Sequence, residues 1–116
     1  IFIFEGPIDS MFTSNGIAIC GLHLTDIQHQ ILQKYSLYQR IWVPDNQLRD
    51  IAGKEKTFEL LDSDERVFIW PKELKDFKDL NDVCVHFKLD QISNKFIINN
   101  SFSGVEAKTR LSLNLV

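Results

Sequence analysis

The segment that decides the fold is Ile1-Phe2-Ile3-Phe4-Glu5-Gly6-Pro7-Ile8-Asp9. Its first four residues are β-branched or aromatic, and such a run predicts a buried strand. Gly6 breaks the strand, and Pro7 suits the first position of a short helix that covers Ile8 to Phe12. Glu5 therefore stands at the carboxyl end of a strand, and Asp9 follows it on a helix.

The alternation of strands and helices continues along the chain. Further strands are expected at residues 17–20, which Gly21 ends, at 39–43 and at 66–70. Helical spacing begins after a cap at Thr25 or Asp26 and returns at 51–61. Residues 80–87 and 89–98 are expected to be helical or mixed, and the last segment, 105–113, is expected to be helical. The expected fold is α/β: an open, mostly parallel sheet of about four strands flanked by helices, with a helical C-terminal segment.

Length and composition indicate one globular domain, residues 1–116. No apolar run approaches the roughly 20 residues needed to cross a bilayer, so no membrane partner is expected. Because the chain starts inside an apolar run and without methionine, we interpret it as a fragment of a longer protein. The net charge of −3 argues against a simple electrostatic DNA-binding module, although it allows an enzyme that reaches phosphates through metal ions.

Two cysteines, Cys20 and Cys84, lie far apart in the sequence in apolar contexts. No Cys-x-x-Cys or Cys/His ligand spacing is present, so zinc is not expected in this fragment. We interpret both as reduced thiols in the core of a cytoplasmic protein.

Acidic residues follow three of the predicted strands. Glu5 follows the first, Asp45 follows the third, and the fourth is followed by Asp76, Asp79 and Asp82. Ligands of open parallel sheets bind at the carboxyl ends of the strands, so these acids are expected at one edge. An oxygen-only ligand set suits a hard cation, Mg²⁺ or Mn²⁺. Acids near strand ends also cap helices and form turns, and we assign that role to Asp26, Asp50, Asp62 and Asp64.

The acidic segments carry a family resemblance. Glu5-Gly6-Pro7-Ile8-Asp9 resembles the opening motif of Toprim (topoisomerase–primase) domains, and Lys78-Asp79-Leu80-Asn81-Asp82 resembles an element of phage and mitochondrial primase–helicase relatives. Val43-Pro44-Asp45-Asn46-Gln47 occupies the place of the family's Asp-x-Asp motif, with Gln47 instead of the second aspartate. The segments 45–49, 67–72 and 102–108 are similar to the catalytic domain of DNA primases of T-even-type phages.

This resemblance implies a role for each matching residue. Glu5, Asp9 and Asp45 would be catalytic, although Asp9 fits equally well as a carboxylate stabilised at a helix start. Metal ligands would be Glu5, Asp45, Asp79 and, through its carbonyl oxygen, Gln47, with Asn46, Asn81 and Asp82 in support. Phosphates of nucleotide or template would meet Arg49, Lys72, Lys75 and Lys78, each of which is otherwise a solvated surface charge.

The resemblance also implies a reaction and partners. The domain would be a DNA-directed RNA polymerase of the primase type, which makes short RNA primers on single-stranded DNA from ribonucleoside triphosphates with Mg²⁺ or Mn²⁺. A replicative helicase and a zinc-binding domain of the same chain, outside this fragment, would assist it in the cytoplasm, that of the host cell if the protein is phage-encoded. The isolated fragment is not expected to prime alone.

Other interpretations remain open at the level of sequence. The chain could be a Toprim-type nuclease or a topoisomerase fragment, although neither Tyr35 nor Tyr38 stands in a context that suggests a nucleophile. It could also be a metal-free α/β binding module. Trp42 and Trp70 are expected in the core rather than stacked on bases, and structural or surface roles are expected for His23, His29 and His86.

Overall fold

The computed structural model describes residues 1–20, 24–36 and 39–116. Within these residues, one sheet has the strand order β2-β1-β3-β4-β5. The strands are β1 (Phe2–Phe4), β2 (Gly16–Ala18), β3 (Ile41–Val43), β4 (Arg66–Phe68) and β5 (Ser101–Phe102). The first four are parallel and β5 is antiparallel to β4. The expected open, mostly parallel α/β sheet is confirmed.

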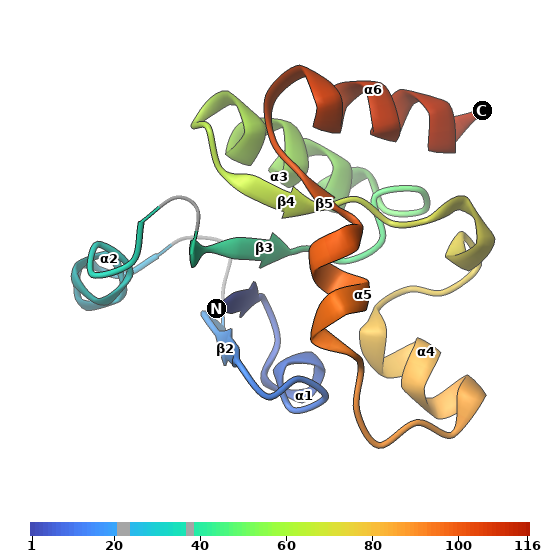
Figure 1. The fold of residues 1–116 in the computed structure, drawn as a ribbon, viewed down its shortest axis with the longest axis horizontal. Helices are drawn as coiled ribbons and strands as arrows, with labels where there is room; N and C mark the ends of the chain where they lie inside the picture. The colour runs from blue at the N-terminus through green and yellow to red at the C-terminus, as the bar shows by residue number, and fades with distance from the viewer. Residues whose placement is uncertain (21–23, 37–38) are drawn as a thin grey trace.

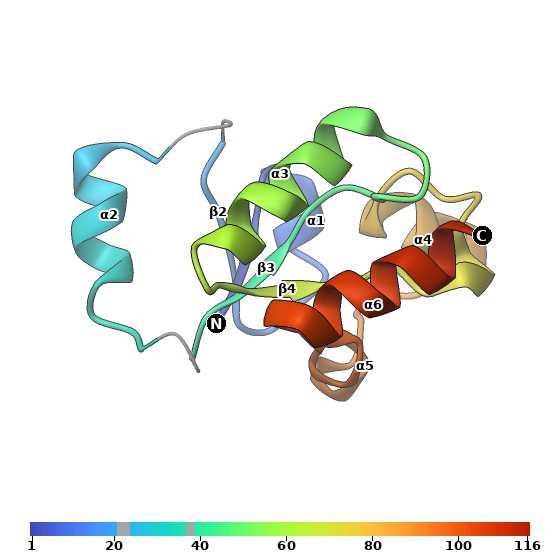
Figure 2. The same ribbon diagram turned by 90° about the horizontal axis from the view of Figure 1, so that it is seen from above.

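Helices cover the sheet from both sides. They are α1 (Pro7–Ser10), α2 (Asp26–Leu32), α3 (Ile51–Asp62), α4 (Leu80–Phe87), α5 (Asn94–Asn99) and α6 (Gly104–Leu115), with a 3-10 turn η2 (Lys72–Leu74). Helix α3 lies beside α6, and α1 lies beside α4 on the other side of the molecule (Figure 1). Helix α2 stands apart at one end, as Figure 2 shows from above. No helix of the described part is long and apolar enough to cross a membrane.

The core consists of two apolar clusters, one on each face of the sheet. Phe2 and Phe4 of β1 belong to the cluster that includes α4 and α5, whereas Ile3 between them belongs to the cluster of α3 and α6. Successive side chains of a strand point to opposite faces. A strand buried on both faces is therefore apolar at every position, which explains the unbroken run at the start of the sequence.

Short polar side chains set the helix boundaries. Thr25, rather than Asp26, caps α2 through a reciprocal pair of hydrogen bonds with Gln28. Asp50 accepts from the backbone N–H of Gly53 and caps α3, in agreement with the structural role expected for it. Asp62 ends α3 and pairs with Lys108 of α6 at 3.3 Å.

Three features differ from the sequence predictions. A fifth strand was missed because β5 has only two residues and pairs at the edge of the sheet. In the segment 89–98, expected to be helical or mixed, a helix begins only at Asn94 and continues to Asn99. Cys20 is exposed rather than in the core, because it follows the edge strand β2, where no neighbouring strand covers it; Cys84 is buried as expected. Gly21, His23 and Tyr38 lie outside the described residues.

A close backbone approach leaves no room for a side chain at Gly16. A Cβ atom there would lie 2.3 Å from Thr13 Oγ1 and 2.6 Å from the backbone oxygen of Ser10. We expect Gly16→Ala to lower the free energy of unfolding by about 1–3 kcal/mol through overpacking. Gly6→Ala is the matched control, because its Cβ would meet nothing closer than 3.7 Å. Equal melting temperatures of the two variants would contradict this packing.

Candidate metal centre

Three carboxylates meet at the carboxyl edge of the parallel strands. Asp9, Asp45 and Asp79 each offer an oxygen atom, and these atoms lie within 4.8 Å of one another. Asp9 comes from α1, Asp45 from the loop after β3, and Asp79 is the N-cap of α4. Their convergence follows from topology, because neighbouring parallel strands deliver their following loops to the same edge.

The cluster lines an open hollow of about 390 Å³. Glu5 at the end of β1 and the loop residue Lys78 also line it, together with Asn81 in the first turn of α4. The charged residues that line the hollow are thus four partly buried acids and the exposed Lys78. A site with this composition attracts cations and repels anions unless a cation is bound.

Backbone N–H groups orient two of the carboxylates. The N–H of Asn81 donates to Asp9 Oδ1 at 2.8 Å, which joins α1 to α4 across 72 positions of sequence. The N–H of Asp82 donates to Asp79 Oδ1 at 2.9 Å, and Asp82 Oδ2 in turn accepts from the N–H of Lys78 at 3.1 Å. Asp82 and Asn81 therefore orient ligands rather than extend the cluster.

Burial and mutual repulsion shift the protonation of the cluster. Burial raises the pKa of Asp9 to about 6 against the hydrogen bond from Asn81, and the charge of Asp79 adds to the rise. Burial likewise raises the pKa of Asp45 to about 6, with Glu5 the strongest repelling neighbour.

The pKa of Glu5 is raised by burial, opposed by the charge of Lys56 on α3. Lys56 was not among the residues expected at the site; it lies in the middle of α3, the helix that follows Asp45.

The donor set fits Mg²⁺ or Mn²⁺. Around one Mg²⁺ with oxygens at about 2.1 Å, neighbouring oxygens lie about 3.0 Å apart and opposite ones about 4.2 Å apart. The three oxygens lie within 4.8 Å of one another, so they would move closer together to share one cation. Asp9, Asp45 and Asp79 would hold the cation, and Glu5 would lie beside it. Sulfur or imidazole ligands, which zinc prefers, are absent from this group.

Gln47 does not join the cluster, which differs from its expected role as a metal ligand. Its side chain is only 2% exposed. Its Nε2 donates to the carbonyl of Phe68 at 2.7 Å, and its Oε1 accepts from the N–H of Trp70 at 3.0 Å. Both ends of the amide thus bond to the backbone at the end of β4 and just beyond it, so we exclude Gln47 from the ligand set.

Asn46 is fully buried and connects the two loops that carry Asp45 and Asp79. Its Nδ2 is shared among the carbonyls of Leu74, Lys75 and Phe77, at 3.1, 3.2 and 2.6 Å. Its backbone N–H donates to the carbonyl of Lys78 at 2.9 Å. Asn46 therefore fixes the loop of Asp45 against the segment that leads to Asp79, and it is not a member of the cluster.

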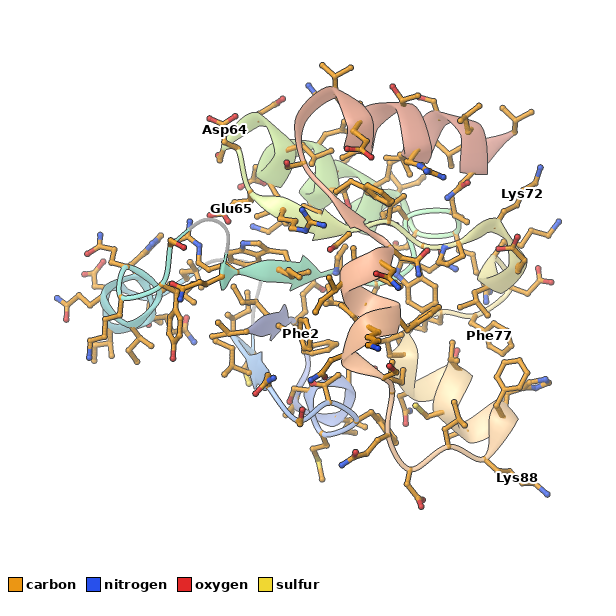
Figure 3. The ribbon with its side chains drawn as sticks, in the orientation of Figure 1. Phe2, Asp64, Glu65, Lys72, Phe77 and Lys88 are labelled. Atoms are coloured by element: carbon orange, nitrogen blue, oxygen red, sulfur yellow. The ribbon has the colours of Figure 1, made fainter. Side chains whose placement is uncertain are left out.

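The four basic residues expected at phosphates are not all gathered at the hollow. Lys78 lines it, and Arg49 donates to the backbone carbonyl of Asp76. Lys72 and Lys75 are exposed, and Figure 3 shows Lys72 at the outer side of the molecule, pointing into solvent.

The aromatic and histidine side chains occupy structural positions. Trp42 and Trp70 are buried as expected, so their rings are not presented to bases. His29 is an exposed residue of α2, and the His86 ring contacts Phe77 at a centroid distance of 5.1 Å. Tyr35 lines a pocket other than the acidic hollow, which gives it no role at the cluster.

Sheet and site together define an α/β domain with a carboxylate cluster at the carboxyl ends of parallel strands. The chain is 37% identical over 114 residues to the DNA primase of Enterobacteria phage T4. The match covers 97% of this chain and 32% of the relative, so the chain spans about a third of that protein's length. No family model matches the chain. The chain is therefore related in sequence to part of a phage DNA primase.

The raised pKa values predict how stability depends on pH without metal. Asp9 and Asp45 bind protons more tightly when folded than when unfolded, so the protein gains stability as the pH falls from above 6 towards the unfolded pKa of about 4. Asp45→Asn should therefore be more stable than wild type at pH 7.5 in EDTA, by about 1 kcal/mol after solvent screening.

Thermal unfolding from pH 5 to 8 measures this difference, which should shrink towards the acid end. Adding Mg²⁺ at pH 7.5 should reverse the order of the two proteins, because cation binding favours the folded wild type. An Asp45→Asn variant that is less stable than wild type at pH 7.5 in EDTA would contradict the electrostatic assignment.

Proposed function

We propose that this chain is the Toprim-like catalytic domain of a DNA primase, and that it catalyses Mg²⁺-dependent synthesis of short RNA primers on single-stranded DNA. The observation that carries the proposal is the cluster of Asp9, Asp45 and Asp79, whose oxygens lie within 4.8 Å. The similarity to a phage DNA primase over 97% of the chain supports it.

The reaction joins the 3′-oxygen of one ribonucleotide to the α-phosphorus of the next and releases pyrophosphate. A bound Mg²⁺ neutralises charge on the phosphates and favours ionisation of the 3′-hydroxyl. Asp9, Asp45 and Asp79 would hold this cation, which would supply positive charge for the phosphates. Glu5 lies next to Asp45 in the hollow, and its raised pKa suits a carboxylate that receives the proton of the hydroxyl.

Lys78 is the basic residue placed to contact nucleotide phosphates, since it lines the hollow. Arg49, Lys72 and Lys75 are exposed and do not line the hollow, and they are proposed contacts for the single-stranded template. The proposal extends to a replicative helicase and to a zinc-binding domain elsewhere in the protein as partners, and to action in the cytoplasm of the cell.

Primer synthesis gives the direct test. In the full-length protein, Asp45→Asn should reduce ribonucleotide incorporation on a single-stranded template by at least about 100-fold, as expected when a group that stabilises the transition state is lost. Asp90→Asn is the matched control, because Asp90 is an exposed acid that does not line the hollow. Full activity of Asp45→Asn, or activity of wild type in EDTA, would refute the proposal.

A further inference from the structure

We propose that Gln47 is a positioning residue, and that residues 44, 46 and 47 form a latch that holds Asp45 in place for the cation. This inference rests on the proposed metal site. It assigns a function to the position where the family pattern has a second aspartate, and the function differs from metal coordination.

The first part of the latch is the side-chain amide of Gln47, which makes the two backbone hydrogen bonds that a neighbouring strand would otherwise make with Phe68 and Trp70. Strand β3 ends at Val43, whereas the Phe68 carbonyl at the end of β4 and the Trp70 N–H just beyond it face the side chain of Gln47. Gln47 satisfies both groups with one side chain, as a paired strand would. A carboxylate here would satisfy the Trp70 N–H but would face the Phe68 carbonyl with a second acceptor.

The other anchors act on both sides of Asp45. The indole Nε1 of Trp70 donates to the carbonyl of Pro44 at 3.0 Å, directly before Asp45. Asn46, directly after it, holds the loop at Leu74, Lys75 and Phe77. Pro44, Asn46 and Gln47 are all buried, whereas Asp45 between them is only partly buried and lines the hollow.

The N-terminal turn of α3 packs against the backbone of Asp45. A Cβ on Gly53 would lie 2.9 Å from the backbone oxygen of Asp45, so the first turn of α3 packs directly against this residue. Asp45 is repelled by the charges of Asp9 and Asp79. The hydrogen bonds of its neighbours and the packing of its own backbone hold it close to them. Such pre-organisation keeps ligands in place before a cation arrives.

Gln47→Glu separates this proposal from the alternative that Gln47 is a weakened metal ligand. The substitution keeps the length of the side chain and adds a charge. If Gln47 were a ligand, Gln47→Glu and the family-like Gln47→Asp would tighten binding of Mn²⁺. If Gln47 is the latch, both substitutions should weaken Mn²⁺ binding at least about fivefold, because the displaced loop carries Asp45 away from Asp9 and Asp79.

The measurement is the dissociation constant of Mn²⁺ from electron paramagnetic resonance, at a temperature at which thermal unfolding shows each variant folded. Asp45→Asn is measured alongside. If it binds Mn²⁺ as wild type does, the metal site itself is wrong; if it loses binding while Gln47→Glu binds as well as or better than wild type, only the latch is overturned.

Two further variants guard against a purely structural effect. Ile97→Val shortens a fully buried side chain of α5 and should lower the melting temperature without changing the Mn²⁺ constant. Trp70→Phe removes the bond to Pro44 and should weaken Mn²⁺ binding even if the Gln47 variants fail to fold. A wild-type Mn²⁺ constant in Trp70→Phe, or an equal loss of affinity in Ile97→Val, would overturn the latch.

Discussion

Repulsion among Asp9, Asp45 and Asp79 is the constraint around which the rest of the domain is arranged. Burial and like charge raise the pKa of Asp9 and Asp45 to about 6, so at neutral pH the folded chain holds ionised groups in an environment that disfavours them. Hydrogen bonds oppose this repulsion. The N–H of Asn81 in α4 donates to Asp9, and Gln47, two residues after Asp45, bonds to the backbone of Phe68 and Trp70 at the end of β4 and just beyond it.

The packing of β1 and two close backbone approaches at glycines hold the site in place. Strand β1 lies between β2 and β3, and its side chains enter both apolar clusters, so Glu5 directly follows a strand that is buried on both faces. Close backbone approaches at Gly16 and Gly53 bring β2 against the end of α1, and α3 against the loop that carries Asp45. A core of this size tolerates few losses, and a site that stores repulsion takes part of the stability which packing provides.

The sequence was informative where a local pattern determines structure. The run from Ile1 to Phe4 predicted a strand, because burial on both faces leaves an apolar signature. Acids after successive strands predicted a shared edge, because topology brings those ends together. It was uninformative where partners are distant in sequence. Gln47 reads as a degraded ligand until its bonds to Phe68 and Trp70 are seen, and Cys20 reads as core until β2 is known to be an edge strand.

The charge balance of the hollow bears on the order of binding. Lys78 faces Glu5, Asp9, Asp45 and Asp79, so the hollow without a cation repels a triphosphate. For the proposed reaction, cation and nucleotide must then bind cooperatively, since each removes the charge that opposes the other. The mildly acidic net charge of −3 is therefore compatible with a nucleic-acid enzyme, because local attraction to phosphates comes from the cation that the carboxylates hold.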